Sequence, residues 1–263
     1  MAEPEPEPDG FVAPTPVPET ETGAPGGDDR VVDRSRVVVF SGGEPLSGEA
    51  AARLEPGAFV VAADSGLEQA QAHGWPVDVA VGDFDSVDPA ALARAEASGT
   101  RVERHPAAKD ATDLSLALAI AAALEPRQIV VADGGGGRLD HLLGGLLALT
   151  DEAYAGIRMS AVVGPAQVHV VRDRLELDAD PGDLVTLLVV GAPAHGVTTG
   201  GLRYPLDHET LHPASTRGVS NVVVDRPAWV QVADGVLLVV LPGPEPLDPT
   251  RPVGPAAPAA PRP

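Results

Sequence analysis

The chain has 263 residues, of which 44 % are hydrophobic, and this is enough apolar surface to exclude a wholly disordered protein. It has no cysteine, which excludes disulfide frameworks, cysteine-ligated metal centres and thiol nucleophiles. The formal charge of −20 argues against nucleic acid or an anionic membrane as the main partner, because phosphate groups bind basic surfaces. We find no membrane-spanning apolar run and no signal peptide, and therefore expect a cytoplasmic protein.

Proline is concentrated at the two ends of the chain. Residues 1–35 hold 7 of the 28 prolines and residues 243–263 hold 8. We expect both segments to be disordered tails, the first acidic and the second rich in proline and alanine.

Residues 36–155 alternate between strand-like and helix-like patterns. Short apolar runs, typical of buried strands, occupy 36–40, 58–64, 77–85 and 128–133. Helical spacing appears between them at 68–73, 89–98 and 114–124, and Asp88 followed by Pro89 is typical of a helix start. This alternation predicts βαβ units in a Rossmann-like, doubly wound parallel sheet, an α/β domain.

Residues 156–242 have a different sequence pattern, without the helix-like segments of the first part. Short β-rich runs separated by glycine and Asp-Gly turns lie at 160–163, 168–171, 184–190, 221–224, 230–232 and 236–241. The pattern predicts a second, all-β domain, a small antiparallel sandwich or barrel.

Acidic or glycine-rich segments follow several expected strands, and in open α/β sheets ligands bind at the carboxyl ends of the strands. Asp83 and Asp85 are two residues apart, so in an extended segment both carboxylates point to the same side. We expect them to bind a divalent cation such as Mg²⁺, joined by Asp64 from the neighbouring strand end. The alternative is an ordinary turn in which aspartate caps a helix.

A second acidic segment, residues 109–113, precedes the helix expected at 114–124. Asp110 and Asp113 are three residues apart and share a helix face, although Asp110 or Thr112 could simply cap the helix. Lys109 is the only lysine beside 17 arginines, which suggests a site that requires a compact ammonium group, such as a phosphate contact.

Four glycines, residues 134–137, precede Arg138 and an expected helix. Glycines allow the backbone to approach phosphates, and a helix N-terminus favours anions. The segment matches neither a Walker A loop nor the dinucleotide-binding fingerprint. His141, close behind it, is either a ligand contact or a packed or capping residue.

In combination, these motifs resemble the thiamine pyrophosphokinase family. The segments DSG at 64–66, GDFDS at 82–86, KDATD at 109–113 and GRLDH at 137–141 occur in the family's order. In the second half, residues 201–206, 217–221 and 234–235 are similar to further family segments. Arg203 stands where lysine is common, and 212–214 differ from the usual glycine before Ser215.

The resemblance implies transfer of the pyrophosphoryl group of ATP to the hydroxyl of thiamine, with Mg²⁺, in a homodimer whose thiamine site lies near the dimer interface. The implied roles fall into four groups: catalysis by Asp83, Asp85, Lys109, Asp110 and Asp113; metal binding by Asp64, Asp83 and Asp85; ATP binding by Ser41, Gly42, Gly43, Asp64, Ser65, Gly66, Arg138, Asp140 and His141; and thiamine binding by Ser215, Ser220 and Asn221.

Three alternatives stay open from the sequence. One is a pyrophosphokinase of the same fold with another acceptor, such as a hydroxymethylpterin. Another is a non-catalytic module that binds nucleotide or thiamine, although such a module has no need to gather carboxylates. The third is a structural or regulatory protein whose tails serve partners.

Overall fold

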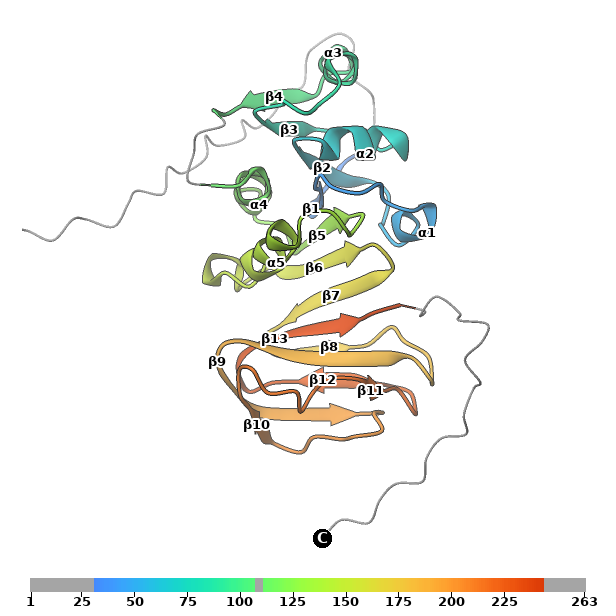
Figure 1. The fold of residues 1–263 in the computed structure, drawn as a ribbon, viewed down its shortest axis with the longest axis vertical. Coiled ribbons are helices and arrows are strands. Elements are labelled where there is room, and N and C mark those ends of the chain that lie inside the picture. The colour runs from blue at the N-terminus through green and yellow to red at the C-terminus, as the bar shows by residue number, and fades with distance from the viewer. Residues whose placement is uncertain (1–30, 107–110, 244–263) are drawn as a thin grey trace, which may run out of the picture.

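The computed structural model describes residues 31–106 and 111–243 (Figure 1). Its strands form one mixed sheet in the order β4-β3-β2-β1-β5-β6-β7-β13-β9-β12-β8, with β10 and β11 paired to β9. The first six of these strands are parallel and the others antiparallel, which confirms an α/β part followed by an all-β part.

The parallel half of the sheet changes its direction of growth between β1 and β5. Strands β2, β3 and β4 lie on one side of β1, whereas β5 and β6 lie on the other, so the carboxyl ends of β1 and β5 flank a topological switch point. The bounds are β1 Asp33–Phe40, β2 Ala58–Ala63, β3 Val79–Gly82, β4 Arg101–Arg104, β5 Gln128–Asp133 and β6 Arg158–Val163.

Helices cover both faces of this half, as a doubly wound sheet requires. Alternate residues of β1 face opposite cores: Val37 and Val39 lie in the cluster that contains Leu118 of α4, whereas Val38 and Phe40 lie in the one that contains Ala50 of α1. Burial of both faces explains the continuous apolar runs in the sequence. The helices are α1 Gly48–Ala51, α2 Gly66–Ala72, α3 Pro89–Ala97, α4 Asp113–Ala122, α5 Leu139–Ala148 and the 3₁₀ turn η1 Glu152–Tyr154.

The antiparallel half is a sandwich in which one long strand, β9, serves both layers. The first part of β9 pairs with β13 and β11, and its last part pairs with β12 and β10. Gly191, with φ of 73°, lies between the two parts, where the register of β9 against β13 shifts. The bounds are β7 Ala166–Val171, β8 Arg174–Glu176, β9 Leu184–Gly200, β10 Glu209–Leu211, β11 Asn221–Val222, β12 Trp229–Gln231 and β13 Asp234–Leu241.

Two strand positions differ from the sequence expectation. β1 begins at Asp33, so the last residues of the expected N-terminal tail belong to the sheet. β6 was expected in the second domain, but it pairs in parallel with β5 and antiparallel with β7, and it therefore links the two halves (Figure 1). Within the described ranges, no helix is long and apolar enough to cross a membrane.

Candidate active site at the carboxyl end of the parallel strands

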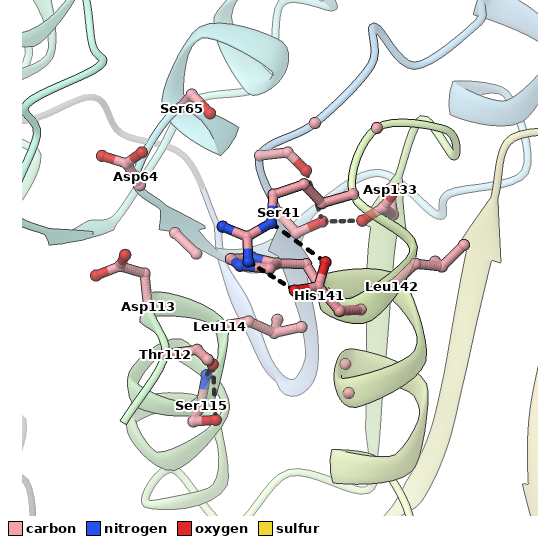
Figure 2. A pocket seen from close by; sticks show the side chains of 18 of the residues that line it. Ser41, Asp64, Ser65, Thr112, Asp113, Leu114, Ser115, Asp133, His141 and Leu142 are labelled. Atoms are coloured by element: carbon pink, nitrogen blue, oxygen red, sulfur yellow. Dashed lines mark hydrogen bonds and ion pairs between the residues drawn. The ribbon is translucent and has the colours of Figure 1, made fainter. Parts of the chain in front are cut away.

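A cavity of about 610 Å³ opens at the carboxyl ends of β1, β2, β3 and β5, beside the first turns of α4 and α5 (Figure 2). Its position is the switch point at which open α/β sheets bind ligands. Most of the ATP-site and catalytic residues expected from the sequence line it: Ser41, Gly42, Gly43, Asp64, Ser65, Asp83, Asp113, Arg138, Asp140 and His141.

Glycines at this edge allow backbone segments to approach one another closely. A Cβ on Gly66 would lie 2.1 Å from the carbonyl oxygen of Phe40, and one on Gly134 would lie 1.8 Å from that of Glu44. A Cβ on Gly42 would lie 2.3 Å from Oγ of Ser65. Gly66 itself is outside the cavity wall and packs the start of α2 against the end of β1. The glycines thus shape the site as well as bordering it.

Asp64 has an unusual backbone and an unsatisfied oxygen. Its φ is 46°, a left-handed value that costs energy for a residue other than glycine. The hydroxyl of Ser86 donates to Oδ2 at 2.7 Å, whereas Oδ1 is buried and has no hydrogen-bond partner among the described residues. An oxygen left in this state is suited to a cation, because a buried carboxylate oxygen without a partner is otherwise unfavourable.

Contrary to the expectation from the sequence, Asp83 and Asp85 do not lie on one side of an extended segment. β3 ends at Gly82, and the buried Phe84 has φ of 59°, so the segment is not extended and the alternation of side chains is lost. Asp83 lines the cavity and its Oδ1 accepts from the backbone N of Asp85 at 3.1 Å, while Asp85 is exposed and outside the wall.

No three acidic, histidine or cysteine side chains in the described chain are grouped as a ready metal site. Mg²⁺ nevertheless needs only one or two carboxylates, since water and substrate phosphates complete its octahedron. The unsatisfied oxygen of Asp64 and the neighbouring Asp83 meet that requirement with the hard oxygen donors that Mg²⁺ prefers. These residues therefore fit the ion, whereas the metal role of Asp85 stays a prediction.

The start of α4 contributes a second side of the cavity. Thr112 caps the helix, with its Oγ1 accepting from the backbone N of Ser115 at 3.1 Å, and Asp113 follows at the cavity wall. Of the two residues that the sequence offered as the cap, Asp110 and Thr112, Thr112 has this role. Lys109 and Asp110 lie outside the described residues, so their expected roles stay predictions.

Asp133 lines the cavity, although the sequence pattern indicated it only as the end of a strand. The hydroxyl of Ser41 donates to its Oδ2 at 2.6 Å, and the backbone N of Gly135 donates to its Oδ1 at 2.7 Å. The carboxylate thus joins the ends of β1 and β5 and holds the glycine loop. A carboxylate between an apolar run and four glycines was the available signal for it.

Arg138, the expected phosphate contact, is already paired. Its Nε and Nη2 donate to Oδ1 and Oδ2 of Asp140 at 3.2 and 2.6 Å. This hydrogen bonding lowers the pKa of Asp140 to about 2 and raises the pKa of Arg138. An incoming phosphate must therefore share the guanidinium with Asp140 or displace it. His141 is exposed at the same wall.

The residues expected to bind thiamine lie apart from this cavity. None of Ser215, Ser220 and Asn221 is among the described residues of its wall, which all come from the α/β half. Ser220 is exposed with φ of 57°, and Asn221 is buried. Within one chain, the structure does not bring the two expected groups of substrate residues together.

Comparison with known proteins identifies the family. Residues 52–160 match the thiamin pyrophosphokinase catalytic domain, and residues 169–237 match the vitamin B1 binding domain of the same family. Together the two matches span more than half of the chain. The chain belongs to the thiamine pyrophosphokinase family. The expected family, and with it the class of ATP-dependent pyrophosphotransferases, is confirmed.

Relatives with known names and structures agree with this assignment. Thiamine pyrophosphokinase of Bacillus subtilis is 27 % identical over 167 residues, which are 63 % of this chain and 78 % of that protein. Its crystal structure superposes with a TM-score of 0.71 at 23 % identity, covering 80 % of this chain and all of that one. The thiamin pyrophosphokinase of Candida albicans has a TM-score of 0.63 at 15 % identity, covering 78 % and 88 % of the two chains. These structures support the fold.

Proposed function

We propose that the chain transfers the pyrophosphoryl group of ATP to the hydroxyl of thiamine, producing thiamine diphosphate and AMP. The observation that carries the proposal is the cavity at the switch point, because its wall brings the acidic and glycine-rich motifs together. The same chain matches both domains of the thiamine pyrophosphokinase family. A module that only binds nucleotide has no need for so many carboxylates facing an anionic ligand.

The charge of the cavity requires a cation together with ATP. Its described wall carries one arginine, Arg138, against five carboxylates: Asp64, Asp83, Asp113, Asp133 and Asp140. A triphosphate entering this wall alone would be repelled. Mg²⁺ bound beside Asp64 and Asp83 would neutralise the phosphates and polarise the one under attack, and we infer that ATP enters as its magnesium complex.

At the β-phosphorus the reaction forms one bond and breaks one, and a proton leaves the attacking hydroxyl. The thiamine hydroxyl oxygen attacks the β-phosphorus of ATP, the bond from that phosphorus to the bridging oxygen of AMP breaks, and AMP leaves. The hydroxyl proton passes to a carboxylate, for which Asp83 is the candidate in the described chain and Asp110 the one outside it. Phosphoryl transfers depend mainly on positioning and charge neutralisation, and this wall provides residues for both.

We propose that thiamine is bound between two copies of the chain. Ser215, Ser220 and Asn221 are absent from the described cavity wall of their own chain, so a partner copy would have to present them. α5, which borders the cavity, exposes one apolar stripe of Leu139, Leu143 and Leu147, with exposed fractions of 67, 51 and 53 %. A contiguous apolar stripe beside a binding site is typical of an interface.

Mixing two inactive variants tests the shared site. An Asp83→Asn chain and a Ser220→Ala chain, each with little activity alone, should regain part of the wild-type rate when unfolded and refolded together, because some heterodimers contain one intact site. The same treatment of each variant alone is the control. Absence of recovery from variants that do form mixed dimers would contradict a site shared between copies.

The activity itself is tested by product analysis with the full-length chain. With ATP, Mg²⁺ and thiamine, we expect AMP and thiamine diphosphate in equal amounts. Parallel reactions with a hydroxymethylpterin test the alternative acceptor, and reactions without acceptor measure simple hydrolysis. Turnover of the pterin in place of thiamine would replace the proposal by the alternative, whereas binding without AMP would indicate a non-catalytic module.

The expected cytoplasmic location stays a prediction.

A further inference from the structure

The carboxylate of Asp133 has no role in the steps proposed above, although it lies in the centre of the switch point. It is the last residue of β5, and Ser41 is the first residue after β1. Each of its oxygens accepts one short hydrogen bond, from the hydroxyl of Ser41 and from the backbone N of Gly135. A carboxylate has about four acceptor positions, so each oxygen keeps a further one.

The remaining acceptor positions are open to the cavity. Asp133 is part of the cavity wall, and Gly43 is a nearby wall residue, on which an added Cβ would lie 3.9 Å from Oδ1. Because Gly43 carries no side chain, nothing from this residue covers that oxygen. The two hydrogen bonds fix the orientation of the carboxylate, so a ligand group meets a rigid pair of acceptors rather than a mobile side chain.

Asp133 is separated from Asp64, the labelled carboxylate that we assign to the metal. In Figure 2, Asp64 lies on one side of the cavity, together with Asp113, and Asp133 lies on the other. Its negative charge disfavours phosphate and favours groups that donate hydrogen bonds. In a nucleoside triphosphate, the part next to the phosphates that donates two adjacent hydrogen bonds is the vicinal diol of the ribose.

We infer that Asp133 is a specificity-determining residue that accepts hydrogen bonds from the ribose hydroxyls of the nucleotide, and that Ser41 and Gly135 hold it for this purpose. The inference rests on the proposed function. It orients ATP in the cavity: the sugar lies at the switch point between β1 and β5, and the triphosphate extends towards Asp64 and Asp83. An acidic residue at a strand end that binds ribose is also a feature of dinucleotide-binding sheets.

The test compares binding of ATP and 2′,3′-dideoxy-ATP, each with Mg²⁺ and without thiamine, by titration calorimetry. The wild-type chain should bind ATP roughly tenfold more tightly, the factor expected for a hydrogen bond to a charged acceptor. Asp133→Ala should bind both nucleotides equally. Asp133→Asn keeps the shape of the side chain and its contact with Gly135, and it should reduce the preference for ATP. If the alanine variant does not fold, the result with Asp133→Asn tests the inference in its place.

Ser41→Ala removes one of the two hydrogen bonds that hold the carboxylate and leaves the carboxylate and the bond from Gly135 in place. Its preference for ATP over the dideoxy nucleotide should therefore be smaller than that of the wild type and larger than that of Asp133→Ala. Equal binding of both nucleotides by the wild-type chain, or an undiminished preference in the folded Asp133 variants, would overturn the inference. So would a wild-type preference for ATP over inosine triphosphate that disappears in Asp133→Ala, since it would place Asp133 at the base.

The outcome is distinguishable from failure of the proposed function. A ribose preference that depends on Asp133, in a chain that forms no AMP with any acceptor, would support the inference and reject the activity. Normal formation of AMP and thiamine diphosphate without any ribose preference would do the reverse.

Discussion

The side chain of Asn221 forms hydrogen bonds with both the backbone N–H and the backbone carbonyl of Tyr204. Its Oδ1 accepts from the backbone N of Tyr204 at 3.0 Å, and its Nδ2 donates to the backbone carbonyl of the same residue at 2.8 Å. Oδ1 also accepts from the backbone N of Val222 at 2.9 Å. Because Asn221 is buried and three of its hydrogen bonds go to backbone, it fixes the segment around Tyr204 whether or not it also meets thiamine.

Asn221→Ala should therefore lower the stability of the fold as well as any binding. The change leaves three backbone groups without their partners, and we expect a loss of roughly 2–4 kcal/mol in the free energy of unfolding. Urea denaturation followed by circular dichroism measures it. Ser220→Ala, which changes an exposed neighbour, is the control and should alter stability by less than about 0.5 kcal/mol. Equal stabilities for the two variants would show that Asn221 has no such structural role.

Gly66→Ala and Gly134→Ala should distort the cavity. In each case the new Cβ would lie within about 2 Å of a carbonyl oxygen, of Phe40 or of Glu44, and backbone must move to relieve the contact. We expect a destabilisation of about 3 kcal/mol or more together with weaker binding of ATP. Gly156→Ala, where an added Cβ would meet nothing within 4 Å, is the matched control. Wild-type melting temperatures for the first two variants would contradict these contacts.

Asp140→Asn should strengthen the binding of ATP. The carboxylate now engages two nitrogens of Arg138, and its neutralisation both releases the guanidinium and removes one negative charge from the cavity. Because both side chains are exposed, we expect a two- to fivefold gain in affinity, of the order measured for exposed ion pairs. Arg138→Ala provides the comparison and should weaken binding. Weaker binding by Asp140→Asn would instead indicate that Asp140 itself contacts the nucleotide.

His169 should make stability dependent on pH on the mildly acidic side. Burial in β7 lowers the pKa of its imidazole below the ordinary value of 6.5. Between the lowered pKa and 6.5, the unfolded chain binds a proton that the folded chain does not. Stability from this group is thus fully present above pH 6.5 and is lost as the pH falls towards the folded pKa.

The comparison of wild type with His169→Gln by urea denaturation at pH 7.5 and pH 5.5 tests this expectation. The wild-type chain should lose more stability between the two values than the variant. His212→Gln, at an exposed position, controls for the removal of any histidine. A variant with the same loss as the wild type would show that His169 contributes nothing to the pH dependence.

The parallel half of the fold was predictable from the sequence because its strands are buried on both faces and several of its helices carry side-chain caps. Asp88 caps α3 through the backbone N of Ala90 at 3.0 Å, as its position before Pro89 predicts. β4 was missed because Arg101–Arg104 is a short edge strand with charged residues and no apolar run. β9 was expected to end at 190, because the glycine at 191 is typical of a turn; here it marks a bend within one strand.

The sequence was enough to predict which strand ends form the site. It was not enough to predict which way the individual side chains point. The sequence indicates that Asp64 and Asp83 meet at one edge of the sheet, and both line the cavity. It does not show that Phe84 adopts a left-handed backbone, which turns Asp85 out of the wall. Nor does it show the link from Ser41 to Asp133, which are 92 residues apart in the chain and meet only when β1 and β5 pair.

The most direct test of the central claim is the measurement of AMP and thiamine diphosphate as a function of Mg²⁺ concentration, for the wild type and for Asp83→Asn. We predict equal amounts of the two products from the wild type, none in the presence of excess chelator, and a loss of turnover by a factor of about 100 or more in the variant, as expected for removal of a group that stabilises the transition state electrostatically. Formation of ADP in place of AMP, or a rate indifferent to both the chelator and Asp83→Asn, would contradict the account.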